Sequence, residues 1–477
     1  MKMKIIVYYT IIILEIFVGF WCLYRAFKYM YKQNKKEHDK ELYNEKKANI
    51  LIVIPCLREQ DIIVQTLNHF LKLIGNMENV KLLVVTTQKE EYERNQILHL
   101  KDEFIKDVKN NMDLSKLIGK YNKLMSTNDI KEILEYSNTE SKEEFIKNKI
   151  DSSKTTSSVV KEFITANNLE DKLFHVHYPN NDGMMADQLN YVLNSFEFSN
   201  EEEYYFSVYN ADSIPSKDTI KEVLETINKN NMPKVIQQYS VPLSNWEELS
   251  NLMKGFAIYQ SNFELRNGLI NASFPRKSLY TYVVGHGMYV RVDILKKIGG
   301  FETKYWCEDI YMSYVLRNNE ISIYPIKTLE NMQSPQYLSI LMKQNAVWFK
   351  TSFECLKIFK DVFKQNGVIN TGSIGWLMQR IRMNITWLGL PIAILYTFII
   401  SVINKNIFML GLALASYLLM ILLEYGSTIK MIENVTEIKL KSKIKVLFGT
   451  AIATAISNIG PIYSLLSRKK EKYKTVR

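Results

Sequence analysis

The chain has 477 residues, 47% of them hydrophobic and 23% charged, with a formal net charge of +11 at pH 7. This length allows two or three domains, and a chain that is both apolar and highly charged favours soluble and membrane parts in one polypeptide. The basic charge does not indicate nucleic-acid binding, because the sequence has no basic stripe with interleaved aromatic residues and no known reader motif. The four scattered cysteines give no disulfide framework and no metal-binding spacing.

An apolar stretch near the N-terminus, residues 5–24, is long enough to span a bilayer. Glu15 interrupts it, and a carboxyl group inside a span needs a partner that the sequence does not identify. No small-residue cleavage site follows, so we expect an uncleaved anchor rather than a signal peptide. Residues 1–33 are therefore assigned to an N-terminal transmembrane anchor.

Three further apolar stretches lie near the C-terminus. The first two, residues 385–403 and 407–425, are long enough to span the bilayer and are joined by a short polar link. The third stretch, residues 444–466, is interrupted by an asparagine, a glycine and a proline within 458–461. We assign residues 385–477 to a C-terminal membrane domain.

Basic residues concentrate beside these segments, at 25–47, 430–445 and 468–477. The positive-inside rule places these flanks in the cytoplasm, where they can also lie against anionic lipid headgroups. A single crossing by residues 444–466 would put the basic tail outside, so we expect a re-entrant or interfacial element there. A plain, kinked fourth span is the alternative. Residues 351–384, with apolar residues at helical spacing amid Lys and Arg, predict interfacial helices.

Between the membrane segments, apolar runs alternate with helical patterns, which predicts an α/β domain with a parallel sheet. Residues 48–55 and 80–87 are typical of buried strands, and with a helix at 62–74 they form a βαβ unit. Further strands are expected at 172–179, 204–209, 234–240 and 321–325, two more within 282–300, and helices at 217–230 and 338–349. Residues 90–168 break the alternation and are interpreted as a helical insertion.

The stretch 204–213 is the one around which the chain is organised. Its aromatic, apolar strand stops at Asn210 and Asp212, and residues just past such a strand face the ligand crevice of an open α/β sheet. Two oxygen-bearing side chains at this spacing suit a hard cation such as Mg²⁺ or Mn²⁺, which usually shares its site with substrate phosphates. A polar turn after a strand explains the same residues without any ligand.

Two other pairs of polar residues also have a structural and a chemical interpretation. His175 and His177 share one face of their strand, but no third residue has metal-ligand spacing, so packed or edge histidines are favoured. Glu308 and Asp309 open a predicted helix, a position where carboxylates are stabilised by the helix dipole.

The order of six short motifs carries more information than any one of them. The chain has PCLRE after its first strand, GMMADQLN before a helix, NADS after a later strand, a GHG loop, CED at a helix start, and QNAVW shortly before the membrane segments. This ordered set resembles the family 2 glycosyltransferases, in particular the membrane-embedded branch that includes cellulose, chitin and hyaluronan synthases. The resemblance runs from about Asn49 to Phe349.

The resemblance implies a GT-A fold, which is a Rossmann-like nucleotide-sugar-binding domain, with a divalent cation, Mg²⁺ or Mn²⁺, as cofactor. It implies an inverting transfer by one displacement, from a cytosolic nucleotide-sugar donor to a polysaccharide or lipid-linked glycan. Residues 34–350 would form this cytoplasmic domain of a multi-pass protein of the cell membrane. The expected partners are the donor, the glycan or lipid-linked acceptor, the bilayer and export or assembly proteins, and no nucleic acid.

The resemblance also suggests residue roles. Asp212 looks like the second acidic residue of the DxD motif, which contacts the metal and the donor diphosphate. Asp309 looks like the general base, with Glu308 beside it. Donor contacts are expected from Pro55, Arg58, Glu59, Gly183 and Asn210, and acceptor contacts from His286, Trp306, Gln344 and Trp348. Ordinary packing is the competing role for the two tryptophans.

Several positions depart from the family pattern. Asn210 stands where DxD has its first aspartate, Met184 replaces the lysine of the GK motif, and Val347 replaces the arginine of QxxRW. The second strand ends in Thr86-Thr87-Gln88, without the aspartate that often contacts uracil. The alternative hypothesis is therefore a catalytically degenerate homologue that acts as a binding or assembly subunit of a glycan synthesis and export complex. A transporter is disfavoured because the spans show no internal repeat.

Overall fold

The computed structural model describes residues 2–36, 48–122, 124–125, 127–135, 138–152, 154–274, 282–436 and 439–467. The chain divides into two compact units, each built from segments that are distant in sequence. The sheet unit contains residues 47–220 and 285–304, and the helical unit contains residues 1–46, 221–284 and 305–473. The chain passes from one to the other within α10 (Thr219–Lys229).

Five strands in the order β3-β2-β1-β4-β8 form the core of the sheet unit. They are β1 (Asn49–Pro55), β2 (Val80–Thr87), β3 (Leu173–Tyr178), β4 (Tyr204–Val208) and β8 (Met288–Arg291). The first four are parallel to one another, and β8 is antiparallel to β4. The continuous apolar runs of β1 and β4 follow from burial on both faces of the sheet. The sequence predicted these four parallel strands.

Helices cover both faces of this sheet. α2 (Ile63–Ile74) connects β1 to β2, α8 (Thr156–Asn167) precedes β3, and α9 (Met185–Ser195) connects β3 to β4. α2 packs against α8. Because parallel connections are right-handed, α2 and α8 cover one face and α9 covers the other. A short α12 (Val292–Lys297) follows β8.

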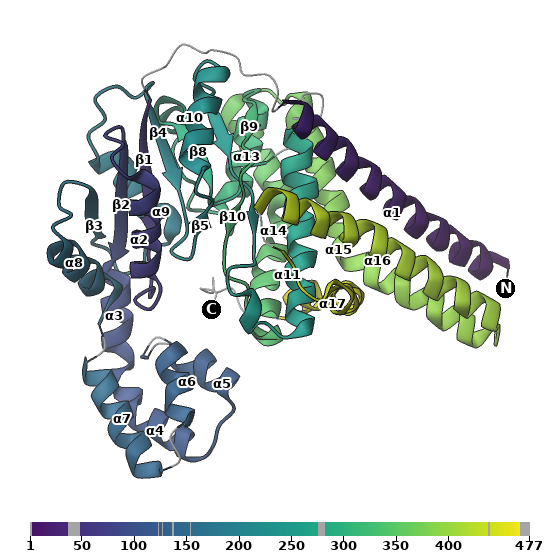
Figure 1. Ribbon diagram of the computed structural model, residues 1–477, viewed down its shortest axis with the longest axis horizontal. Helices are drawn as coiled ribbons and strands as arrows, with labels where there is room; N and C mark the ends of the chain where they lie inside the picture. The colour runs from purple at the N-terminus through teal and green to yellow at the C-terminus, as the bar shows by residue number, and fades with distance from the viewer. Residues whose placement is uncertain are drawn as a thin grey trace. The chain divides into compact units, whose positions relative to one another are not determined.

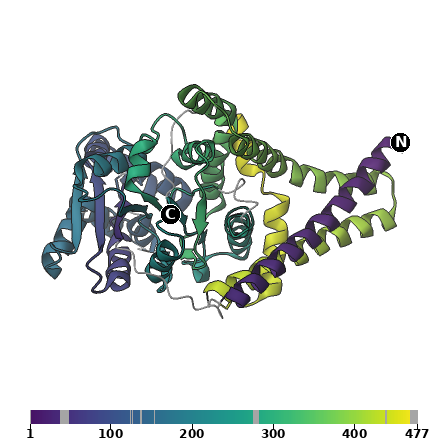
Figure 2. The same cartoon turned by 90° about the horizontal axis from the view of Figure 1, so that it is seen from above.

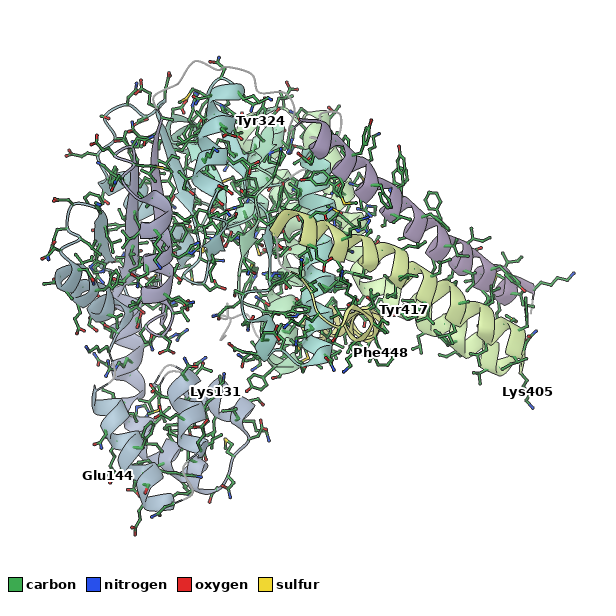
Figure 3. All side chains as sticks on the ribbon, viewed as in Figure 1. Lys131, Glu144, Tyr324, Lys405, Tyr417 and Phe448 are labelled. Atoms are coloured by element: carbon green, nitrogen blue, oxygen red, sulfur yellow. The ribbon has the colours of Figure 1, made fainter. Side chains whose placement is uncertain are left out.

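The insertion between β2 and β3 is helical, as the sequence predicted. It comprises α3 (Gln88–Ile97), α4 (Lys101–Lys109), α5 (Leu114–Tyr121), α6 (Thr127–Glu135), α7 (Thr139–Ser152) and then α8. Helices α4 to α7 gather into a small bundle, in which Lys131 of α6 and Glu144 of α7 are labelled (Figure 1, Figure 3). The bundle has its own apolar centre, where the rings of Phe104 and Tyr121 lie 4.5 Å apart.

The helical unit combines short strands with long apolar helices. Its strands are β6 (Val235–Gln237), paired in parallel with β9 (Ile323–Pro325), and β7 (Ser240–Val241), paired in parallel with β10 (Glu330–Asn331). Its principal helices are α1 (Lys2–Lys36), α11 (Asn251–Phe263), α13 (Glu308–Asn318), α14 (Leu338–Asn366), α15 (Thr371–Ile403), α16 (Ile407–Thr436), α17 (Lys443–Ala455) and α18 (Ile459–Leu466).

Among the described residues, four segments are long and apolar enough to cross a membrane: Lys2–Gln33, Thr371–Ile403, Ile407–Thr436 and Lys443–Leu466. α1 lies along α15 and α16 in both ribbon views (Figure 1, Figure 2). The buried Glu15 accepts a hydrogen bond from Ser416 Oγ at 2.7 Å, which supplies the partner that the sequence did not identify.

Two expectations about elements were wrong in detail. Residues 282–284 form no strand, because the backbone N–H groups of Val283 and Val284 donate to the side chains of Ser313 and Gln237 instead of a neighbouring strand. The helix expected at 338–349 continues to Asn366. The interruption expected near Asn458 is present, since α17 ends at Ala455 and α18 begins at Ile459.

Candidate functional site

The carboxyl edge of the parallel strands gathers most of the predicted donor residues. Strands β1 and β4 are direct neighbours, with Val53 opposite Val208. Pro55 closes β1, and the turn from Asn210 to Asp212 follows β4, so both lie at the same edge of the sheet. In open α/β sheets this edge carries the ligand crevice.

The turn after β4 is held by a set of local hydrogen bonds. The backbone N–H of Asn210 donates to Ser213 Oγ at 2.9 Å, and Thr66 Oγ1 of α2 donates to the Ala211 carbonyl at 2.5 Å. Asp212 is only 3% exposed, whereas Asn210 is half-buried. Asn210 to Ser213 therefore form the polar turn that the sequence predicted. This turn holds one carboxylate and one amide at the sheet edge.

This donor set suits a cation that arrives with its substrate. No cluster of three or more His, Cys, Asp or Glu side chains able to hold a metal ion occurs among the residues that the structure describes. Mg²⁺ is commonly held by one or two carboxylates together with substrate phosphates. Asp212, with Asn210 beside it, fits such a shared site.

The GHG loop lies next to this turn. The backbone N–H of Gly287 donates to the carbonyl of Val208, the last residue of β4, at 2.7 Å. Gly287 has a φ of +65°, a left-handed conformation that glycine adopts without strain. The loop places the half-buried His286 beside the end of β4.

The loop after β1 is fastened to the helical insertion. Arg58 has a φ of +59°, and its backbone N–H donates to Glu90 Oε2 at 2.9 Å, while its guanidinium forms an ion pair with Glu93 at 2.9 Å. Glu59 donates its backbone N–H to Thr156 Oγ1 at 2.8 Å, and Thr156 in turn donates to Glu90. The buried Glu90 thus joins this loop to α3 and α8.

Gly183 packs closely against the end of β3. A Cβ atom at this position would lie 2.1 Å from Cε1 of Tyr178. Asn190, at the other end of the motif, exchanges two hydrogen bonds with the backbone of Phe301, at 2.7 and 2.8 Å. Lys89 Nζ lies 3.4 Å from the Gly183 carbonyl oxygen and 3.7 Å from the sulfur of Met184.

The predicted base and the predicted acceptor residues other than His286 belong to the helical unit. Glu308 and Asp309 open α13, and both are half-buried. Asp309 Oδ1 accepts the N–H of Ile310 at 2.8 Å, as a carboxylate at a helix start does. The preceding Trp306 donates its backbone N–H to Glu354 of α14 at 3.2 Å, and the ammonium of Lys350 lies 4.4 Å from the centroid of the Trp306 ring.

Gln344 and Trp348 lie one turn apart on α14. Gln344 is 7% exposed, and its Oε1 atom has no hydrogen-bond partner among the described residues. The carbonyl of Trp348 accepts a hydrogen bond from Thr351 Oγ1 at 2.7 Å, and Thr351 Oγ1 accepts one from Arg380 Nη2 at 3.0 Å. Arg380 of α15 therefore reaches the same part of α14.

Tyr282 connects this region to the start of α13. Its ring stacks on Trp376, with centroids 5.2 Å apart, and its hydroxyl lies within electrostatic reach of both Arg380 and Asp309. Complete burial raises the pKa of Tyr282 well above its usual range, so the group is a neutral phenol. The helical unit thus brings Asp309, Arg380 and the α14 motif into one neighbourhood.

The structure adds residues that motif reasoning missed. Glu90, Glu93 and Thr156 belong to the insertion, for which the sequence predicted helices but no contact with the motifs. No local pattern links these residues to the motifs, because their contacts arise only in the folded chain. The donor residues around Asp212 belong to the sheet unit, and the carboxylates of α13 belong to the helical unit.

No protein-family model matches the chain. No curated protein matches it either. Among solved structures, the chain is similar to "Mannosyltransferase PcManGT from Pyrobaculum calidifontis in complex with GDP-Man and Mn2+", with 11% identity, coverage of 97% of this chain and 99% of that one, and a TM-score of 0.46. It is also similar to S. aureus TarS 1–349, with 12% identity, coverage of 88% and 92%, and a TM-score of 0.34.

Proposed function

We propose that this protein is a membrane-bound inverting glycosyltransferase with a GT-A fold, of the membrane-embedded branch of family 2. It transfers a sugar from a nucleotide-sugar donor to a growing polysaccharide or lipid-linked glycan. The observation that carries the proposal is the carboxyl edge of the sheet unit, where the loop after β1, the Asn210–Asp212 turn and the GHG loop meet.

The sheet unit supplies the donor-binding residues of this proposal. The loop from Pro55 to Glu59 holds the nucleotide, and Gly183 permits a close approach of the backbone. Asp212, with Asn210, would hold a divalent cation, whose charge stabilises the departing diphosphate. The pairing of Arg58 with Glu93 means that Arg58 positions the loop rather than binding phosphate itself.

The helical unit supplies the base and most acceptor contacts. The acceptor hydroxyl oxygen bonds to the anomeric carbon while the bond from that carbon to the diphosphate oxygen breaks. The hydroxyl proton passes to the carboxylate of Asp309, with Glu308 beside it. Trp306, Gln344 and Trp348 position the acceptor, as does His286 of the sheet unit. The ammonium of Lys350 lies over one face of the Trp306 ring.

The first prediction tests the base. Asp309→Asn keeps the shape of the side chain but removes its capacity to take a proton, so sugar transfer should fall about 10²- to 10⁴-fold. The measurement is transfer from a panel of labelled nucleotide sugars by the full-length protein in membranes. Asp218→Asn, an exposed carboxylate at the start of α10, is the control and should transfer at the normal rate.

Unchanged transfer by the Asp309→Asn variant would remove Asp309 from the mechanism. Binding of nucleotide sugars without turnover by the unmodified protein would instead favour the degenerate binding or assembly subunit. The replacements at Asn210, Met184 and Val347 motivate that second function.

A further inference from the structure

Basic side chains line one face of α1 at the point where its apolar stretch ends. Arg25, Lys28 and Lys32 lie three and four residues apart, so they share a face of the helix. Lys32 Nζ donates a hydrogen bond to the Ser273 carbonyl at 2.6 Å. The ammonium groups of Lys28 and Lys32 lie 5.4 and 4.9 Å from the centroid of the Phe274 ring. The three cations are therefore gathered on one side of α1, within the helical unit.

Arg25 is held in place by neutral oxygen atoms. Its Nη2 atom donates to Asn271 Oδ1 at 2.7 Å and to the Arg266 carbonyl oxygen at 3.2 Å. Among the described residues, no ion pair joins Arg25, Lys28 or Lys32 to a carboxylate. These contacts orient the half-buried Arg25 guanidinium and leave its charge available to an anion.

A second arginine adds its charge beside Arg25. Arg266 lies in the π-helical turn Glu264–Ile270, is only 6% exposed, and is within electrostatic reach of Arg25. Its Nη2 atom donates to Ser427 Oγ at 3.1 Å, and its Nε atom lies 3.8 Å from the Glu424 carboxylate, while its Nη1 atom has no hydrogen-bond partner within the described part of the chain. Glu424 can balance one of the two arginine charges, so the pair keeps a net positive charge.

Aromatic side chains mark the depth of this basic face in the membrane. Trp21, Tyr24 and Phe27 of α1 are all exposed. Such side chains gather where a span leaves the hydrocarbon core and enters the headgroup layer. The rings of Tyr24 and Phe27 carry the ammonium groups of Lys28 and Lys430, 5.8 and 5.3 Å from the ring centroids. The basic face therefore lies at the level of the lipid phosphates.

We propose that Arg25, Lys28 and Lys32 bind the phosphate of an anionic phospholipid at this end of α1. Arg25 presents a planar fork of N–H donors to the phosphate oxygens, and the two lysines act as point charges. Arg266 positions Arg25 through its carbonyl oxygen and adds its own charge. The acyl chains of the lipid lie along the apolar surface of α1. This inference goes beyond the proposed function and does not depend on sugar transfer.

The test is quenching of tryptophan fluorescence in the full-length protein, reconstituted in phosphatidylcholine bilayers. One preparation contains brominated phosphatidylglycerol, and the other contains the same share of brominated phosphatidylcholine. Trp21 lies one helical turn before Arg25, so it reports a brominated lipid held at this face. Trp21→Phe supplies the signal of the other tryptophans for subtraction. Phosphatidylglycerol should quench Trp21 more strongly, because its phosphate charge is not balanced by a choline group.

A pair of double variants shows whether this basic face causes the preference. Arg25→Gln/Lys28→Gln should lower the preference for phosphatidylglycerol about tenfold or more, because each basic residue near an anionic surface contributes about a factor of five. Lys2→Gln/Lys4→Gln removes the same charge from the other end of α1 and should keep the preference. Equal quenching by the two lipids in the unmodified protein, or an undiminished preference in the Arg25→Gln/Lys28→Gln variant, would overturn the inference.

Single variants separate binding from folding. Lys28→Gln alters an exposed side chain and should lower the preference about fivefold. A normal preference in that variant would overturn the inference even if the double variant does not fold. Arg25→Lys keeps the charge and should keep most of the preference, and a loss as large as that of Arg25→Gln would contradict the role of the Arg25 charge.

Competition with inorganic phosphate distinguishes a lipid from a soluble anion. Inorganic phosphate should not relieve the quenching by brominated phosphatidylglycerol, because it lacks the acyl chains that lie along α1. Relief at a concentration that leaves the ionic strength unchanged would assign the site to a soluble phosphate and overturn the lipid. Sugar transfer does not enter these measurements, so a failure of the proposed glycosyltransferase activity and a failure of this inference are seen separately.

Discussion

His175 and His177 of β3 share one hydrogen-bond partner, the hydroxyl group of Thr86. Thr86 Oγ1 lies 2.8 Å from His175 Nε2 and 2.9 Å from His177 Nδ1, and His177 Nε2 lies 3.2 Å from Gln88 Oε1. Since Gln88 Oε1 can only accept, His177 carries its proton on Nε2, Thr86 donates to His177 Nδ1, and His175 donates to Thr86. This chain of hydrogen bonds requires the His177 imidazole to be neutral, because one of its nitrogens accepts while the other donates.

The second prediction concerns the pH dependence of stability. Burial lowers the pKa of His175 to about 4, with Lys161 of α8 and His177 adding to the effect, and burial also lowers the pKa of His177 despite the nearby Glu91 and Glu90 of α3. The unfolded chain, with ordinary histidine pKa values near 6.5, binds more protons between pH 6.5 and 4. The free energy of unfolding should therefore fall as the pH falls through this window.

The measurement is the melting temperature of the purified protein at pH 7 and pH 5. His175→Gln keeps hydrogen-bonding capacity without a titrating ring, so it should reduce the decline in melting temperature from pH 7 to pH 5. His99→Gln, which alters an exposed histidine of the insertion, should leave the decline as it is. Equal declines in the His175 variant and the unmodified protein would contradict the prediction.

The sequence identified residues that follow strands, but not their partners. Asn210 and Asp212 were recognisable because a buried strand ends just before them. The pairing of Arg58 with Glu93, and the approach of Lys89 to Met184, join residues 35 and 95 positions apart. Such contacts depend on how the insertion packs, which local patterns do not encode.

At the scale of elements, the contact between α14 and α18 governs the placement of the QNAVW segment. A Cβ atom on Gly460 of α18 would lie 2.4 Å from Asn345 Cβ and 3.2 Å from the Asn345 carbonyl carbon, on α14. Backbone atoms cannot yield as a flexible side chain does. Gly460 therefore permits a short distance between α18 and α14 that a residue with a Cβ atom would not allow.

The third prediction is that Gly460→Ala forces α18 away from α14. Overpacking of this kind costs about 1–3 kcal/mol, so the melting temperature should fall and sugar transfer should weaken with it. The matched control is Gly389→Ala in α15, where the added methyl group meets no atom within 4 Å. If both variants melt at the temperature of the unmodified protein, α18 does not position α14.

Strands and helices with strong periodicity were predictable, and those fixed by tertiary contacts were not. The parallel strands β1 to β4 appear as apolar runs of the right length. Residues 282–284 have the composition of a strand, yet side chains of α13 and β6 take their hydrogen bonds. α14 runs past Phe349 because its second half packs against the segment before α13, through Glu354 and Asp361.

At the scale of the whole molecule, the arrangement of the membrane helices yields a fourth prediction. The link between α15 and α16 carries Lys405, labelled at the tip of this helix pair in Figure 3. With the basic segments inside, a cysteine at Asn406 should react with a membrane-impermeant thiol reagent on intact cells. Cysteines at Lys441 and Thr475 should react only after lysis, since we propose that residues 444–466 are re-entrant.

The native cysteines 22, 56 and 355 are buried and give little background. Labelling of Thr475→Cys without lysis would place the tail outside and establish a simple fourth span. Residues 468–477 lie outside the described part of the chain, and the break between α17 and α18 is compatible with either course. The assembly of each unit from discontinuous segments was not predictable, because hydropathy reveals spans but not which of them pack together.

The packing of α1 against α16 has a consequence for biosynthesis. Tyr8 donates a hydrogen bond to the Met409 carbonyl at 2.5 Å, and Glu15 meets Ser416, in both cases across 401 positions of the chain. α1 therefore waits, with a carboxyl group in its middle, until its partners 401 positions later in the chain have been made. During that interval the Glu15 carboxyl group needs water, protonation or an insertase, because Ser416 is not yet there to donate its hydrogen bond.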